Sequence, residues 1–178
     1  MSLLKYILTE QKNFTSIDHI LNMSSWKPPK YLYHLTPHDY INDVKKNGLQ
    51  IKYSKQHKFE RGIYLTDDFS VAIQYQYLDE ERDNFYIIEI PFNKLNPNYM
   101  KPDDYELFDI IEDEWQDILD FLGIYEVRGN EQLIWESLDY EHSIFICNQI
   151  LYTQDIKSVD FSNVYDKKLS NQKLWDTK

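Results

Sequence analysis

The chain has 178 residues, of which 42% are hydrophobic and 16% aromatic, so it is long and apolar enough to bury a core as a single domain. Its formal net charge of −11 disfavours a nucleic-acid partner because an acidic protein repels phosphate backbones, although a local basic patch would still admit one. Cys147 is the single cysteine and excludes an internal disulfide, and neither a secretory signal nor a membrane-spanning apolar run is present, so we expect a soluble cytoplasmic protein without membrane contact.

Two short amphipathic helices are predicted first, over residues 2–12 and 15–24, because apolar residues recur there three and four positions apart. The following Pro28-Pro29 pair cannot continue such a pattern, since proline disfavours helical backbone before and at its own position. We therefore expect residues 1–30 to form an N-terminal helical extension that precedes the main domain.

A strand is predicted over residues 31–35, where aromatic and apolar side chains dominate. Thr36 and Pro37 come next and have the residue types of a helix N-cap and a first helical position. The helix that they would begin is expected to stop at Asn47-Gly48, because glycine commonly follows the last turn of a helix.

The next elements are a polar loop over residues 50–61 and a strand over residues 62–66. Asp67 or Asp68 is expected to cap the helix after this strand, since a short carboxylate accepts hydrogen bonds from free N–H groups at a helix start. Apolar residues at helical spacing extend this helix at least to Tyr75.

The second half of the chain alternates helical and extended patterns. We predict a strand over residues 85–91, an extended loop over 94–106 and an acidic helix over 107–122 that ends at Gly123. Residues 132–138 suit a strand or a helix, and strands are predicted over 143–147 and 156–161. Such a mixed order predicts an α+β fold. The main domain is expected to span residues 31–165, with a tail at 166–178.

Three segments hold the residues with candidate chemistry. They read YHLT at 33–36, GIYLTDDFSVAIQY at 62–75 and YEHSIFICNQI at 140–150. Each is weak alone, because a histidine at a strand end, a tyrosine in an apolar strand or one acidic residue among thirty is more often structural than functional. Their order along the chain is more specific than any one of them.

The ordered set resembles the histidine–tyrosine–glutamate branch of the ADP-ribosyltransferase superfamily, which includes diphtheria-toxin-like and PARP-like enzymes and small bacterial and phage proteins. The matching segments are Tyr33-His34-Leu35-Thr36, Asn47-Gly48, Gly62-Ile63-Tyr64-Leu65-Thr66, Ala72-Ile73-Gln74-Tyr75 and residues 141–150. The resemblance implies an ADP-ribosyltransferase-like fold with a split, mainly antiparallel two-sheet core and an NAD cleft, preceded by short N-terminal helices.

By this resemblance, three residues would act on NAD as co-substrate. His34 would hydrogen-bond the ribose of the adenosine half, Tyr64 would stack on the nicotinamide ring, and Glu141 would stabilise the cation that forms on the ribose as nicotinamide leaves. The other NAD-binding positions that the resemblance implies are Leu35, Thr36, Thr66 and Tyr75. No metal is expected, because no spacing of histidine, cysteine and carboxylate residues suits one.

Leu35 departs from the family pattern, and at two further positions the assignment of a role is open. Leu35 stands where the family usually has glycine, beside the expected nicotinamide position. Asp139 lies two residues before Glu141, where protein-modifying transferases position the acceptor, and is the candidate for that role here. Glu136 is a rival of Glu141 for the carboxylate role, because the segment between residues 126 and 142 aligns ambiguously.

The function implied is an NAD-dependent ADP-ribosyltransferase that transfers ADP-ribose to a macromolecule, preferably a protein, as a toxin, an effector or a phage counter-defence protein. Two alternatives keep the fold: an NAD hydrolase, and an inactive module that binds NAD or a partner. A DNA- or RNA-modifying transferase is the other alternative, which the charge disfavours. The loop at residues 52–61 is a candidate lid over the NAD cleft.

Overall fold

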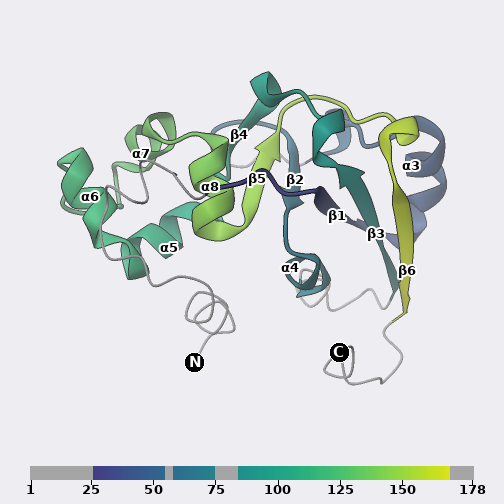
Figure 1. Cartoon of the computed structure of the whole chain (residues 1–178), viewed down its shortest axis with the longest axis horizontal. Helices are drawn as coiled ribbons and strands as arrows, with labels where there is room; N and C mark the ends of the chain where they lie inside the picture. Colours follow the sequence, from purple (N-terminus) through teal and green to yellow (C-terminus); the bar gives the residue numbers. More distant parts are fainter. Residues whose placement is uncertain (1–25, 55–57, 75–83, 169–178) are drawn as a thin grey trace.

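The computed structural model describes residues 26–54, 58–74 and 84–168, drawn in colour in Figure 1. The helices predicted over residues 2–12 and 15–24 lie outside the described residues, and so does Tyr75. Within the described part, strands and helices are both present, which confirms the predicted α+β class.

The strands form one six-stranded antiparallel sheet in the order β4-β5-β2-β1-β3-β6. Their bounds are Tyr31–Pro37 for β1, Ile63–Thr66 for β2, Asn84–Pro91 for β3, Met100–Pro102 for β4, Gln149–Tyr152 for β5 and Asn163–Lys168 for β6. Within the described ranges this single sheet replaces the two sheets that were expected.

The centre of the sheet is nevertheless weakly joined. β1 and β3 pair along the whole of β1, from Tyr31 opposite Pro91 to Pro37 opposite Phe85. By contrast, β1 and β2 pair at one position, where Tyr33 lies opposite Thr66. The three strands on either side of this junction therefore form two halves that touch at one place in the ladder.

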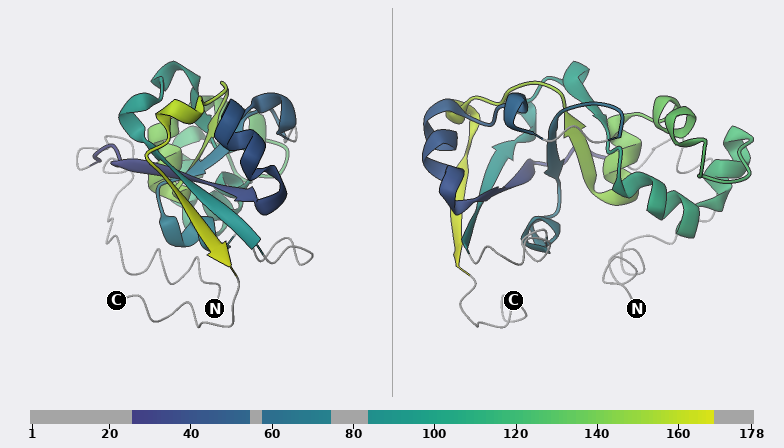
Figure 2. Two further views of the ribbon diagram at one scale, coloured as in Figure 1. Left: turned by 90° about the vertical axis from the view of Figure 1, so that its right-hand side faces the viewer. Right: turned by 180° about the vertical axis from the view of Figure 1, so that it is seen from behind.

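The described residues also form six helices, whose bounds are Ile41–Asn47 for α3, Phe69–Gln74 for α4, Glu106–Glu114 for α5, Gln116–Leu122 for α6, Glu131–Ser137 for α7 and Tyr140–Cys147 for α8. Short 3₁₀ turns occur at His38–Tyr40, Ile51–Tyr53, Phe92–Lys94, Pro97–Tyr99 and Ser158–Asp160. Figure 1 shows α5 to α8 gathered beyond the β4–β5 edge, whereas α3 lies at the β6 end; Figure 2 shows the same separation from behind.

Two hydrophobic clusters hold these parts together. One is built mainly from α5 to α8, with the fully buried Leu107, Ile118 and Ile134 inside it. The other covers the sheet and includes the buried Leu32 and Ile150. Trp26 packs against both, although it falls in the segment that was expected to be a separate extension.

The predicted start of the first described helix was wrong. Thr36 and Pro37 belong to β1, because their pairing with β3 continues through Pro37. The chain enters a 3₁₀ turn at His38 without a side-chain cap, and α3 follows. The predicted end is confirmed, since Gly48 follows the last residue of α3 with a positive φ of 80°.

The predicted strand at residues 143–147 was wrong, because these residues form the second half of α8. Asp139 begins this helix: its Oδ1 accepts hydrogen bonds from the N–H groups of Glu141 and His142 at 2.9 and 3.0 Å. All five residues of 143–147 are buried. Because buried and exposed positions do not alternate in this run, the sequence pattern alone cannot distinguish a buried helix from a buried strand.

Several other predicted elements differ from the structure in their bounds or type. The predicted loop at residues 94–106 contains β4, and the predicted helix at 107–122 is two helices that meet at Trp115. The predicted strand at 156–161 is an isolated bridge at Ile156 followed by a 3₁₀ turn, and the true last strand is β6. Because β6 runs to Lys168, it crosses the boundary that was predicted at residue 165.

Candidate functional site

A cavity of about 390 Å³ opens where β1 and β2 diverge, and this volume lies within the range of small-molecule sites. β1 contributes Tyr33, His34 and Leu35 to its wall, and β2 contributes residues 64–66. The rest of the wall comes from α4, the turn between β4 and α5, and the first residue of β5. The site is thus assembled from segments that are distant in sequence.

His34 lines this cavity and is held by β2 across the junction. Its Nδ1 lies 2.9 Å from the carbonyl oxygen of Tyr64. Because a carbonyl can only accept, Nδ1 carries the hydrogen. Burial lowers the pKa of His34, although this hydrogen bond opposes the shift, so the ring is neutral at pH 7. Nε2 then has a lone pair with which it can accept a hydrogen bond from a hydroxyl group.

Tyr64 also lines the cavity, as the resemblance implied. Its hydroxyl donates a hydrogen bond to Oδ1 of the fully buried Asp104, whose Oδ2 accepts from the N–H of Phe59 at 3.0 Å. The phenol is therefore fixed at its hydroxyl end. Phe59, from the candidate lid, packs edge-on against Phe108, so this part of the loop is anchored to α5.

Three of the other predicted NAD-binding positions fall near the junction. Leu35 lines the cavity and leaves it open, in spite of its bulk. Thr66 also lines it, but its Oγ1 accepts a hydrogen bond from the N–H of Asp68 at 3.1 Å and so stabilises the start of α4. Thr36 is buried in β1 and does not line the cavity.

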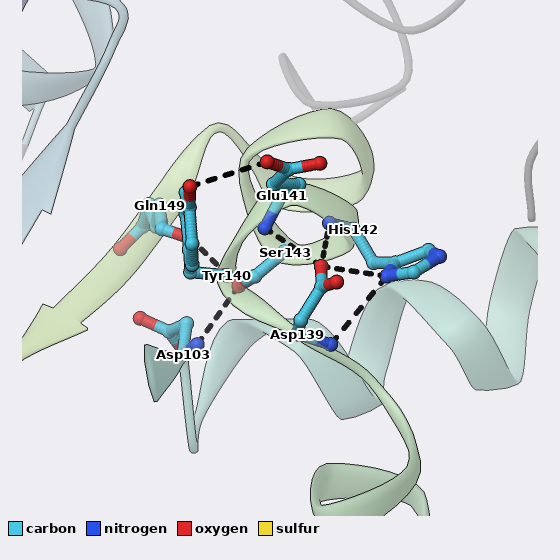
Figure 3. A network of polar contacts seen from close by, with 7 residues as sticks. All are labelled: Asp103, Asp139, Tyr140, Glu141, His142, Ser143 and Gln149. Carbon is cyan, nitrogen blue, oxygen red and sulfur yellow. Dashed lines mark hydrogen bonds and ion pairs between the residues drawn. The ribbon is translucent and has the colours of Figure 1, made fainter. Parts of the chain in front are cut away.

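The structure does not bring Glu141 together with His34 and Tyr64. Glu141 lies in the first turn of α8, outside the cavity wall, and its Oε1 accepts a hydrogen bond from the hydroxyl of Tyr140 at 3.1 Å (Figure 3). The rival carboxylate, Glu136, lies outside the wall too, and it accepts from Gln132 along α7 at 2.8 Å. Residues 143–147, which follow Glu141, belong to α8 and not to the strand that was expected there, whereas Glu136 lies on α7.

Asp139 caps α8, and no part of it lines the cavity. Besides the two N–H groups, its Oδ1 contacts Nδ1 of His142 at 2.7 Å, and this contact holds the pKa of Asp139 below its ordinary value. The position predicted for acceptor binding therefore has a structural role in the described fold.

We expect Asp139→Ala to lower the free energy of unfolding by about 1 kcal/mol, because the first turn of α8 loses its side-chain cap. Urea unfolding followed by circular dichroism measures this, with Asp139→Asn as the matched control, since asparagine is an equally good cap. Equal stability of the alanine variant and the native chain would contradict the capping role.

The cavity contains polar side chains that the sequence did not single out: Asp103 and Glu106 at the start of α5, and Gln149 at the start of β5. Burial raises the pKa of Glu106, and that of Asp103 to about 7. Tyr105 adds a third tyrosine to the wall, after Tyr33 and Tyr64, and is 62% exposed. The carboxyl groups at this site thus come from the turn between β4 and α5.

Of the missed residues, Asp103 had a local signal in the sequence. The Asp103-Asp104 pair follows Pro102 directly before an acidic helix, a composition that is typical of a helix start. Gln149 had none, because its place in the cavity depends on β5, which the sequence pattern did not reveal.

Within the described residues, no group of three or more histidine, cysteine or acidic side chains is arranged to hold a metal ion. No helix in those same ranges has both the length and the apolar character needed to cross a bilayer.

The chain matches no protein-family model, and no curated protein matches its sequence. The family resemblance therefore depends on the motifs and on how the site is arranged.

Proposed function

We propose that this protein is an NAD-dependent ADP-ribosyltransferase whose co-substrate binds in the cavity between β1 and β2. One observation carries the proposal: His34 and Tyr64, which the family resemblance selects from separate segments, line the same cavity. Leu35 and Thr66, two further positions from that resemblance, are in its wall as well.

The cavity has groups suited to both halves of NAD, with His34 expected at the ribose of the adenosine half. The tethered ring of Tyr64 offers a flat face to the cationic nicotinamide, and the neutral His34 offers an acceptor to a ribose hydroxyl. In the reaction, the bond between nicotinamide and ribose C1′ breaks, and its electron pair leaves with the nicotinamide. An acceptor nucleophile then bonds to C1′ and loses its proton. The net charge of −11 favours a protein acceptor over a nucleic acid.

The first test replaces Tyr64 with alanine. We expect NAD to bind about tenfold more weakly, since the variant loses the stacking surface. Calorimetric titration with NAD measures the affinity, and a nicotinamide-release assay measures turnover. Tyr125→Ala is the matched control, because Tyr125 is 96% exposed and does not line the cavity.

Two results would overturn the proposal: a native chain that fails to bind NAD, or equal NAD affinities in the Tyr64→Ala and Tyr125→Ala variants. Incubating the native chain with labelled NAD and a lysate, followed by mass spectrometry of proteins and nucleic acids, identifies the acceptor class. Nicotinamide release without labelled macromolecules would instead indicate an NAD hydrolase.

A second candidate is a module that binds NAD without turnover. The observation that favours it is the amide of Gln149 in the cavity wall, together with the position of Glu141 outside that wall. An amide is neutral and stabilises a developing cation less than a carboxylate does. Saturable NAD binding without nicotinamide release, in buffer and in lysate, would select this candidate.

A further inference from the structure

Asp103 has an unusual position in the cavity wall. The residue is fully buried, and its Oδ1 accepts hydrogen bonds from the N–H groups of Tyr105 and Glu106 at 2.8 and 2.7 Å. Its Oδ2 is also buried and has no hydrogen-bond partner. One oxygen of this carboxyl group thus stabilises the start of α5, and the other lacks a hydrogen-bond partner.

A buried polar atom without a hydrogen-bond partner destabilises the folded chain, and native proteins keep few of them. Asp103 lines the cavity together with the polar residues Tyr64 and Gln149. A bound ligand with a hydroxyl group beside Asp103 would supply the missing partner, so the unpaired oxygen is a reason to place a ligand there.

Ser143 fixes Asp103 in relation to β5. Its Oγ accepts a hydrogen bond from the N–H of Asp103 at 2.8 Å and donates one to the carbonyl oxygen of Gln149 at 2.7 Å. Figure 3 shows this link, and shows Glu141 directed instead to Tyr140. The buried hydroxyl of α8 therefore holds the two polar wall residues at a constant spacing.

We infer that Asp103 is the catalytic carboxyl group of this site, in the role that the resemblance assigned to Glu141. The inference rests on the proposed NAD reaction. The ionised carboxylate accepts a hydrogen bond from a hydroxyl of the nicotinamide-side ribose, and its charge stabilises the cation at C1′ as the electron pair leaves with nicotinamide. The acceptor nucleophile, or water, then adds to C1′, and its proton passes to the carboxylate or to solvent.

Burial raises the pKa of Asp103 to about 7, and the nearby charge of Asp104 adds to this, while the two N–H groups oppose it. The other titratable groups that face it are Glu106 and the buried thiol of Cys147, whose pKa is raised well above its ordinary value. Since the carboxylate is the active form, nicotinamide release should rise with pH through about 7.

The test is Asp103→Asn, which keeps an oxygen for the N–H groups of Tyr105 and Glu106 and removes the charge. We expect nicotinamide release to fall on the order of 100-fold and to lose its rise with pH. NAD affinity should change much less, because the lost interaction is strongest in the transition state. Asp109→Asn is the control, since Asp109 lies exposed on the same helix outside the cavity wall.

The outcomes separate the two proposals. A native chain that neither binds nor cleaves NAD overturns the proposed function. A chain that cleaves NAD equally fast with Asp103→Asn overturns the inference alone, as does loss of cleavage in Glu141→Gln with full activity in Asp103→Asn. If Asp103→Asn does not fold, the native pH profile decides: a release rate that stays constant from about pH 6 to 8 contradicts the assignment.

Discussion

Replacing Gly48 with alanine is expected to lower the free energy of unfolding by about 3–5 kcal/mol. Gly48 has φ 80° and ψ −174°, a combination that is costly for any residue with a Cβ atom. A Cβ built there would lie 2.1 Å from the carbonyl oxygen of Ile156. That oxygen accepts from the N–H of Leu49 at 2.8 Å, and the N–H of Ile156 donates back at 2.9 Å. The alanine would therefore separate α3 from the segment before β6.

Gly123→Ala is the matched control, because Gly123 also has a positive φ, 69°, but no atom lies within 4 Å of the Cβ position. Its cost is expected to be about 1 kcal/mol, from the left-handed backbone alone. Urea unfolding of both variants measures the difference. Equal destabilisation would mean that backbone conformation accounts for the whole effect and that the contact with Ile156 contributes nothing.

Both glycines were also visible in the sequence as helix ends, and this shows which features local signals could predict. The strands around Tyr33, Tyr64 and Ile88 could be predicted because aromatic and β-branched residues stand there between turn residues. β4 could not, since it is short and ends in proline, which is typical of an edge strand.

α8 could not be recognised for a different reason. Asp139 is the residue type of a helix cap, yet the SIFIC run behind it suits a buried strand equally well. The helical form depends on packing against β4, β5 and α5, which are tertiary contacts. Glu141 lies in the first turn of this helix and outside the cavity wall, which the prediction of a strand at residues 143–147 did not anticipate.

The residues of the candidate site also fall into those that local sequence signals predict and those that depend on tertiary contacts. His34 and Tyr64 could be predicted, because each lies in a strand with a local motif. Asp103 and Gln149 come together through the buried hydroxyl of Ser143, a contact between residues about forty positions apart that no local pattern encodes.

Replacing Glu89 with alanine is expected to lower the free energy of unfolding by about 2–4 kcal/mol. Glu89 is 6% exposed, and its side chain joins β3 to β6 and to Ser162 before it. Its carboxylate accepts hydrogen bonds from the hydroxyl of Ser162 at 2.6 Å, the amide of Asn163 at 2.8 Å and the hydroxyl of Tyr165 at 2.9 Å. Alanine would leave these three donors without that partner. Glu126→Ala, at an exposed glutamate, should change the stability by less than about 0.5 kcal/mol.

The pH dependence of the same carboxylate identifies the charge as the source of this stability. Burial would raise the pKa of Glu89, but the three donors, Ser162 foremost, hold it below the ordinary value of 4.5. A lowered pKa in the folded state means that the contribution is complete above about pH 4.5 and is lost as the pH falls through the folded pKa. Glu89→Gln, which keeps the shape, should therefore destabilise the chain at pH 7, and the difference from the native chain should shrink at about pH 3.5. If the difference instead stays constant between these pH values, the donors recognise the shape of the side chain rather than its charge.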